Sequence, residues 1–518
     1  MKISYATEER QLDKKVTMKI NIEKIFTLGE LKSSGYKSLP VKEEMRRNLI
    51  EILRTNKNPF DNIIGYEETV LPDIQTAILS RHNIILLGLR GQAKTKIARM
   101  MTTLLDEYIP VIKDSELNDD PFNPLSRFGK DIIAELGDET PITWMHRNER
   151  YTEKLATPDV TIADLIGDVD PIKAASLKLH YSDDRVIHFG LIPRSHRGIF
   201  VINELPDLQA RIQVALFNIL QEKDVQIRGF KVRLPLDVQF IFTANPEDYT
   251  NRGSIVTPLK DRIDSQILTH YPKTISISQK ITEQEAKLTE EQSGRIKIPE
   301  LIKNLIEQIA FEARDSEFVD HKSGVSARLT ISALENIVSF AERRLLINNE
   351  ASTNVRVSDL IGVIPSITGK IELVYEGEQE GPVKVAHILI GKAIKSRFIN
   401  YFPSPDKLKR KTQTNPYQDV VAWFAKGNLF DLFHNISDEE YRKKLLSVPG
   451  LKTLVDKYFQ EQNSETKLLL MEFTLHGLSE FSMLSKHRIE YGLQFKDMLS
   501  SMLTSADEPE QNEEESYI

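Results

Sequence analysis

Hydrophobic and polar positions follow two successive patterns along this chain. From about residue 58 to 272, short apolar runs rich in β-branched residues alternate with segments whose apolar positions have helical spacing. Between residues 295 and 350 only the helical spacing remains. Strands and helices that alternate along a chain build a parallel sheet covered by helices. The first region therefore predicts an α/β fold, and the second predicts an all-α region that follows it.

The same patterns predict the organisation of the chain. Six acidic residues and no basic one occupy positions 507–515, a composition that favours disorder. Residues 1–40 show no regular pattern, whereas Val41–Arg54 has the spacing of an amphipathic helix. We expect an irregular lead-in over 1–40, an α/β domain over 41–275, a helical lid domain over 276–375, a mostly helical region of unknown role over 376–506, and a disordered tail over 507–518.

Composition narrows the environment and the partners. The 518 residues carry a net charge of −8 and contain no cysteine. No apolar run approaches the roughly 18 residues that a membrane-spanning helix needs, and the first residues lack the apolar core of a secretion signal. We therefore expect a cytoplasmic protein that does not insert into membranes. The acidic balance argues against nucleic acid as a partner.

A loop with distinctive chemistry follows the apolar run at residues 84–87. Residues 88–95 read Gly-Leu-Arg-Gly-Gln-Ala-Lys-Thr and precede a helix-like segment. This order of strand, glycine-bearing loop and helix is typical of a loop that binds the phosphates of a nucleoside triphosphate. Lys94 would reach the β- and γ-phosphate oxygens, and the Thr95 hydroxyl would bind Mg²⁺. An ordinary turn is the alternative, since Ala93 replaces the usual glycine. The predicted contacts are Gly88, Arg90, Gly91, Gln92, Ala93, Lys94, Thr95 and Lys96.

A second apolar strand, at residues 198–202, ends in Asn203 and Glu204. Glu204 is the candidate that polarises the water attacking the γ-phosphate. Asn203 stands where an aspartate usually holds the Mg²⁺ hydration shell, and its amide oxygen could still accept a hydrogen bond from a metal-bound water. If the missing charge limits the site, Asn203→Asp should raise turnover or Mg²⁺ dependence. The alternative is a buried strand that ends in Asn-Glu by chance.

Three further polar residues follow these motifs in order. A third strand, residues 238–244, precedes Asn245, which could orient the attacking water. Arg262 follows a helical turn after that strand, and Arg328 begins a helix of the later all-α region. Either arginine alone is more simply a surface ion pair. Their order behind two nucleotide motifs instead favours roles in catalysis.

Together these motifs resemble the AAA+ ATPases, and within them the branch of the MoxR proteins and the magnesium chelatase I subunit. The likeness runs from about residue 43 to 350. Two segments resemble features of that branch: residues 155–198 its insert in the second helix, and residues 225–234 its pre-sensor hairpin. The matching motifs are Ile64-Gly65 for the adenine pocket, Gly88–Thr95 for Walker A, Gly198–Glu204 for Walker B, Asn245 for sensor 1, Arg262 for the arginine finger and Arg328 for sensor 2.

The resemblance implies a MgATP-hydrolysing motor that assembles into a homo-oligomeric ring, a hexamer, in which Arg262 enters the neighbour's site. It also implies a chaperone-like role in remodelling or loading a protein client, often one with a von Willebrand A-type domain. A magnesium chelatase-like motor subunit for metal insertion is one alternative. A scaffold that binds ATP but hydrolyses little of it is another, motivated by Ala93 and Asn203.

Overall fold

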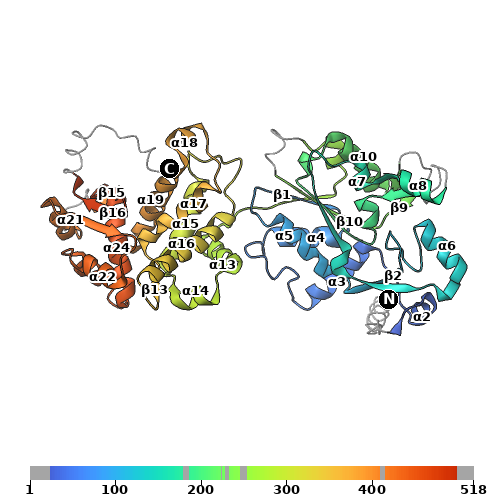
Figure 1. Cartoon of the computed structure of the whole chain (residues 1–518), viewed down its shortest axis with the longest axis horizontal. Helices are drawn as coiled ribbons and strands as arrows, with labels where there is room; N and C mark the ends of the chain where they lie inside the picture. The colour runs from blue at the N-terminus through green and yellow to red at the C-terminus, as the bar shows by residue number, and fades with distance from the viewer. Residues whose placement is uncertain are drawn as a thin grey trace, which may run out of the picture. The chain divides into compact units, whose positions relative to one another are not determined.

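A computed structural model describes residues 24–178, 186–222, 224–227, 233–245, 254–408 and 415–498 of the chain (Figure 1). The described residues form two compact units. The first contains the residues up to 88 and those from 93 to 269, and the second contains residues 89–92 and those from 270 onward. The acidic tail at 507–518 and the tip of the predicted hairpin at 228–232 lie outside the described residues.

A parallel sheet of five strands forms the centre of the first unit. Every pair of neighbouring strands in it is parallel, so all the carboxyl ends lie at one edge of the sheet. This sheet confirms the α/β class predicted from the alternation of apolar runs and helical segments. In spatial order its strands are β11 (Ser265–Leu268), β1 (Ile84–Leu87), β10 (Val238–Ala244), β7 (Gly198–Asn203) and β4 (Tyr151–Leu155).

Helices and three short antiparallel strand pairs complete the first unit. Helix α3 confirms the amphipathic helix predicted from sequence, and the pairing of β8 with β9 confirms the two strands of the predicted hairpin. The helices are α2 (Leu28–Ser33), α3 (Val41–Arg54), α4 (Val70–Leu79), α5 (Lys94–Met100), α6 (Arg127–Leu136), α7 (Ile162–Leu165), α8 (Pro171–Leu177), α9 (Leu191–Arg194), α10 (Ala210–Glu222) and α12 (Thr257–Lys260). The paired strands are β2 (Tyr108–Ile112) with β3 (Ile142–His146), β5 (Gly167–Val169) with β6 (Ile187–Phe189), and β8 (Asp224–Gln226) with β9 (Arg233–Pro235).

The central sheet is buried on both faces, which explains the continuous apolar runs of its strands. Successive side chains of a strand point to opposite faces. In β1, Ile84 and Leu86 belong to the hydrophobic cluster formed with α3, α4 and α5. Ile85 and Leu87 belong to the cluster formed with α10, which covers the other face (Figure 1).

The segment before α3 differs from the expected irregular lead-in. From residue 24 onward it contains α2, whose Thr27 cap accepts a hydrogen bond from the Glu30 backbone. Leu31 is fully buried, and the indole of Trp144 donates a 3.0 Å hydrogen bond to the Ile25 carbonyl. The segment is anchored because its few apolar residues pack against β3, a contact between residues distant in sequence.

Helices dominate the second unit, as predicted, and two small sheets join them. The helices are α13 (Ile275–Glu285), α14 (Glu290–Arg295), α15 (Glu300–Arg314), α16 (Arg328–Ile347), α17 (Ile364–Thr368), α18 (Tyr375–Glu380), α19 (Pro382–Tyr401), α20 (Pro405–Leu408), α21 (Gln418–Ala425), α22 (Asp438–Leu446), α23 (Leu451–Tyr458) and α24 (Ser464–Glu480). The strands are β12 (Ile296–Lys297), paired with β13 (Thr353–Asn354), and the antiparallel sheet of β14 (Phe430–Phe433), β16 (Gly492–Lys496) and β15 (Ser485–Ile489). The strand β12 corrects the expectation that residues 295–350 are wholly helical.

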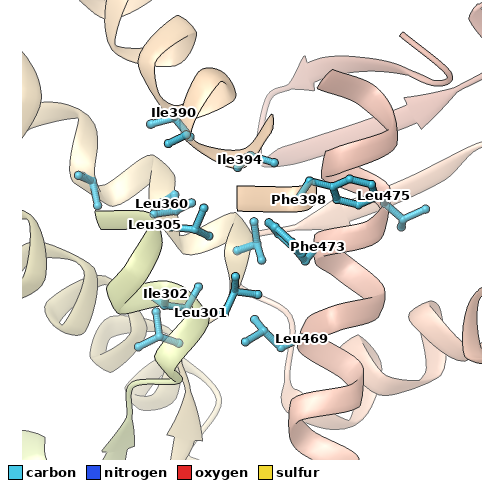
Figure 2. Close-up of a cluster of buried hydrophobic side chains, with 14 of the residues drawn as sticks. Leu301, Ile302, Leu305, Leu360, Ile390, Ile394, Phe398, Leu469, Phe473 and Leu475 are labelled. Atoms are coloured by element: carbon cyan, nitrogen blue, oxygen red, sulfur yellow. The ribbon is translucent and has the colours of Figure 1, made fainter. Parts of the chain in front are cut away.

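One hydrophobic cluster extends through the second unit, from Ile296 to Phe495. Figure 2 shows its centre, where side chains of α15, α19 and α24 meet. The predicted boundary near residue 375 falls inside this shared core and stays a prediction. Among the described residues, no helix is both long and apolar enough to cross a bilayer. The labelled members of the cluster in Figure 2 are Leu301, Ile302, Leu305, Leu360, Ile390, Ile394, Phe398, Leu469, Phe473 and Leu475.

Candidate nucleotide-binding site

The candidate site lies at the carboxyl edge of the central sheet, where three strands end side by side. Leu87 of β1 is level with Ala244 of β10, and the Gly88 amide extends this pairing with a 3.1 Å hydrogen bond to the Ala244 carbonyl. Phe242 of β10 is level with Ile202 of β7. The residues that follow the three strands are therefore brought together by register, as ligand sites in open α/β sheets usually are.

The loop after β1 contains two residues with a left-handed backbone. Gly91 and Ala93 both adopt left-handed conformations, with φ of 71° and 58°. Turns of this kind form concavities lined by backbone N–H groups. The conformation explains why glycine is usual at position 93, because an L side chain there costs roughly 1–2 kcal/mol. Ala93 adopts this conformation directly before α5.

Lys94 is the first residue of α5, directly after the loop. Its ammonium donates a hydrogen bond to the Gly88 carbonyl at the start of the loop, and the residue is only 8% exposed. Thr95 follows it in the first turn of α5 and is half-buried. An ammonium and a hydroxyl are the groups that would contact the phosphates and Mg²⁺ of a bound nucleoside triphosphate, and this assignment of Lys94 and Thr95 stays a prediction.

The middle of the loop, residues 89–92, belongs to the second unit. Within that unit Arg90 forms an ion pair with Glu372, and its carbonyl accepts a 2.9 Å hydrogen bond from the Tyr271 hydroxyl. A Cβ added at Gly91 would lie 2.1 Å from the Ser326 Oγ, so glycine is required there for space as well as for φ. Gln92 is buried.

The two polar residues predicted at the end of this strand, Asn203 and Glu204, lie at the carboxyl end of β7. Asn203 is buried at the last position of the strand, and Glu204 directly after it is half-buried. Glu204 has φ of 54° and ψ of 52°, a left-handed conformation that is uncommon for a residue with a side chain. Strained backbone of this kind gathers at functional sites and persists where the surroundings enforce it.

The sensor 1 and arginine-finger candidates also belong to the first unit. Asn245 is buried directly after β10. Arg262 follows α12, where its Nε donates to the Gln221 side chain at 3.0 Å and its Nη1 to the Pro258 carbonyl at 2.7 Å. Its guanidinium also lies over the Phe217 ring, 4.9 Å from the centroid. Arg262 is thus held against α10 of its own chain.

The remaining predicted residues lie in three different places. Ile64 and Gly65 precede α4, and the Gly65 amide donates to the Glu67 carboxylate. Lys96 is half-buried on α5. Arg328 is the exposed first residue of α16 in the second unit. The assignments of these four residues to nucleotide binding and sensing stay predictions.

Two contacts of Asn203 were not predicted from the sequence. Glu153 of β4 accepts a 2.6 Å hydrogen bond from the Asn203 amide, and Thr243 of β10 donates one of 3.1 Å to the Asn203 oxygen. The only sequence signal was a polar residue within each strand. The strand order β10-β7-β4 is needed to see that these two residues flank Asn203.

Comparison with known proteins found one family model that matches part of the chain and several solved structures that are similar to it. A family model described as the sigma-54 interaction domain matches residues 180–266. That span contains β7, α10, β10, α12 and the first half of β11, and hence Asn203, Glu204, Asn245 and Arg262.

The solved structures that the chain is similar to share low sequence identity with it. A proposed ATPase from Cytophaga hutchinsonii is 18% identical, with a TM-score of 0.28 over 70% of this chain and 97% of that one. NtrX from Brucella abortus is 13% identical, with a TM-score of 0.36 over 70% and 69%. A model of the complex between BchI and BchD of magnesium chelatase gives 16% identity and a TM-score of 0.32 over 62% and 98%.

The family model matches part of the first unit, which the strand order and the two hydrophobic layers show to be a parallel five-stranded sheet covered on both faces. The assignments of Walker A to the loop after β1 and of Walker B to the end of β7 stay predictions for this unit. The second unit supplies the helical region that follows it in the chain.

Proposed function

We propose that this chain is a MgATP-hydrolysing AAA+ ATPase of MoxR type, which assembles into a ring and remodels or loads a protein partner. One observation carries the proposal. Gly88, Glu204 and Asn245 directly follow β1, β7 and β10, and the register of these three parallel strands supports a shared site at the carboxyl edge of the sheet.

Each residue has a role that its chemistry permits. The loop amides and Lys94 would hold the β- and γ-phosphates, and Thr95 would hold Mg²⁺. Mg²⁺, when bound, neutralises charge that develops on the phosphate oxygens. Glu204 would accept a proton from the attacking water, which Asn245 would orient. Arg328 would act from the helical region that follows.

A ring would bring an arginine of one subunit to the nucleotide of the next. The transition state of phosphoryl transfer carries charge that an arginine from a neighbouring subunit can stabilise. Arg262 is our candidate, because it follows the third-strand motif at the position where this branch presents its finger. Assembly would then switch hydrolysis on, and the client would be a protein, with von Willebrand A-type domains the first to test.

Two observations favour a second function, that of a scaffold that binds ATP and hydrolyses little of it. Asn203 carries no charge where Mg²⁺ sites usually have a carboxylate, and Ala93 adopts a strained left-handed conformation in the loop. Both functions require the same phosphate loop. They differ in turnover alone.

Lys94→Ala tests the shared requirement, and Lys130→Ala is its matched control because Lys130 is exposed on α6. Lys94→Ala should weaken binding of a fluorescent ATP analogue by roughly 100-fold, since a charge-assisted contact is lost. It should also abolish phosphate release, while Lys130→Ala matches the wild type in both assays. Unchanged affinity in Lys94→Ala would refute the phosphate-loop assignment. Tight binding without release in the wild type would favour the scaffold.

A further inference from the structure

A chain of hydrogen bonds connects Glu204 to a carboxylate on the outermost strand of the sheet. The Glu204 backbone N–H donates to the Thr243 Oγ1 at 3.1 Å, and this hydroxyl donates to the Asn203 Oδ1 at 3.1 Å. The Asn203 Nδ2 then donates to the Glu153 Oε1 at 2.6 Å. Asn203 and Thr243 are both buried, so these contacts are sheltered from competing water.

The chemistry of the four groups fixes the direction of every bond. An ionised carboxylate can only accept, so the NH₂ of the Asn203 amide must face Glu153. The Thr243 hydroxyl accepts from the Glu204 backbone, which leaves its hydrogen for the Asn203 oxygen. A flipped Asn203 amide would set its oxygen against the carboxylate. Asn203 is therefore held in one orientation by partners on both neighbouring strands.

The other carboxylate oxygen of Glu153 accepts hydrogen bonds from two donors. Its Oε2 accepts from the Arg99 Nε at 2.9 Å and from the Tyr151 hydroxyl at 3.1 Å. Arg99 lies on α5, the helix that follows the phosphate loop. Burial, reinforced by the charge of Glu153, raises the pKa of Tyr151 well above its ordinary value, so the phenol remains a donor.

We infer that Glu153 is a positioning residue of the ATPase site, which supplies from β4 the carboxylate that position 203 lacks and fixes Glu204 through Asn203 and Thr243. The inference rests on the proposed function, because it gives Glu204 its catalytic role. Glu204 has a left-handed backbone that costs roughly 1–2 kcal/mol, so the Thr243 bond to its N–H is a restraint that the site needs.

This arrangement reverses the expectation that Asn203→Asp raises turnover. An aspartate at position 203 would put a second carboxylate where the amide now lies 2.6 Å from Glu153, and like charges at that distance repel strongly. The double variant Asn203→Asp with Glu153→Gln exchanges the two groups. The amide introduced at position 153 can then donate to the carboxylate introduced at position 203, which still accepts from Thr243.

The test is the cycle of wild type, Asn203→Asp, Glu153→Gln and the double variant, with Glu135→Gln as an exposed control on α6. Each single variant should lower kcat for MgATP by at least about 10-fold, with the KM for ATP changed by less than about threefold, since a buried network is broken away from the phosphate contacts. The double variant should recover most of the loss. Glu135→Gln should match the wild type.

Thermal unfolding and affinity for a fluorescent ATP analogue provide readouts that do not depend on turnover. Asn203→Asp should lower Tm, and the added Glu153→Gln should restore it. Additive losses of Tm and kcat in the double variant, or an Asn203→Asp enzyme faster than the wild type, would overturn the inference. A wild type without turnover would refute the proposed function instead, while the coupling in Tm would still report whether the two side chains are paired.

Discussion

Substitution of Arg262 has different measurable effects if the residue only makes contacts within its own chain or if it also acts in the nucleotide site of a neighbouring subunit. In its own chain Arg262 makes two hydrogen bonds, to Gln221 and Pro258, and lies over the Phe217 ring. For a half-buried side chain these contacts are together worth about 1–3 kcal/mol of folding free energy. An arginine finger instead contributes about 10³–10⁵ in rate, or roughly 4–7 kcal/mol of the barrier. Loss of the local contacts would therefore lower the folding free energy, whereas loss of the finger would lower the rate of hydrolysis by a much larger factor.

Arg262→Ala should lower phosphate release by at least about 1,000-fold if the residue acts as a finger, with binding of a fluorescent ATP analogue nearly unchanged. Gln221→Ala is the matched control for the local contacts, because it removes one hydrogen-bond partner and leaves the guanidinium in place. It should lower Tm slightly and leave turnover within about threefold. Arg211→Ala, an exposed change on α10, controls for lost surface charge.

Mixed rings test whether Arg262 acts between subunits. Arg262→Ala and Glu204→Gln subunits should each be inactive alone, yet some interfaces of a mixed ring combine an intact Arg262 with an intact Glu204. Activity should therefore reappear on mixing. A mixture that stays inactive although hetero-rings are shown to form would refute the reasoning. So would wild-type activity per subunit that is independent of concentration through the dissociation range.

Two further predictions concern stability of the first unit. Glu44 and Arg150 form an ion pair with two hydrogen bonds of 2.7 Å, and their side chains are 3% and 1% exposed. Glu44→Gln leaves the buried charge of Arg150 uncompensated, so it should lower the free energy of unfolding in urea by about 3–5 kcal/mol. A loss under about 1 kcal/mol would contradict this. Burial lowers the pKa of His196 to about 4, so only the unfolded chain takes up this proton between pH 6.5 and 4. Stability should therefore fall by about 3 kcal/mol as pH decreases through that window, and His196→Asn should flatten the profile.

Local sequence was enough to predict the strands and the helix that carry the candidate site residues. The apolar run at 84–87 and the loop after it are contiguous, so strand, turn and helix follow from one stretch of chain. The apolar strands that precede Asn203 and Asn245 could be recognised in the same way. Parallel strands bring their carboxyl ends together, so the meeting of these residues could also be anticipated.

Glu153 could not be predicted because its role depends on which strand lies beside β7. That pairing joins residues about fifty positions apart, and nothing within residues 151–155 indicates it. The small sheet of the second unit was missed for a related reason. Strands β15 and β16 are short and largely polar, and only Phe495 is fully buried among their side chains. Their pairing with β14 is again distant in sequence.

Phosphate release by wild type and Glu204→Gln, measured together with binding of a fluorescent ATP analogue, tests the ATPase assignment most directly. Glu204→Gln keeps the phosphate loop and removes the proton acceptor, so it should bind the analogue as tightly as the wild type and release phosphate at least about 100-fold more slowly. Glu135→Gln should match the wild type in both measurements. Equal rates of phosphate release from wild type and Glu204→Gln would contradict the assignment of the catalytic site to the end of β7.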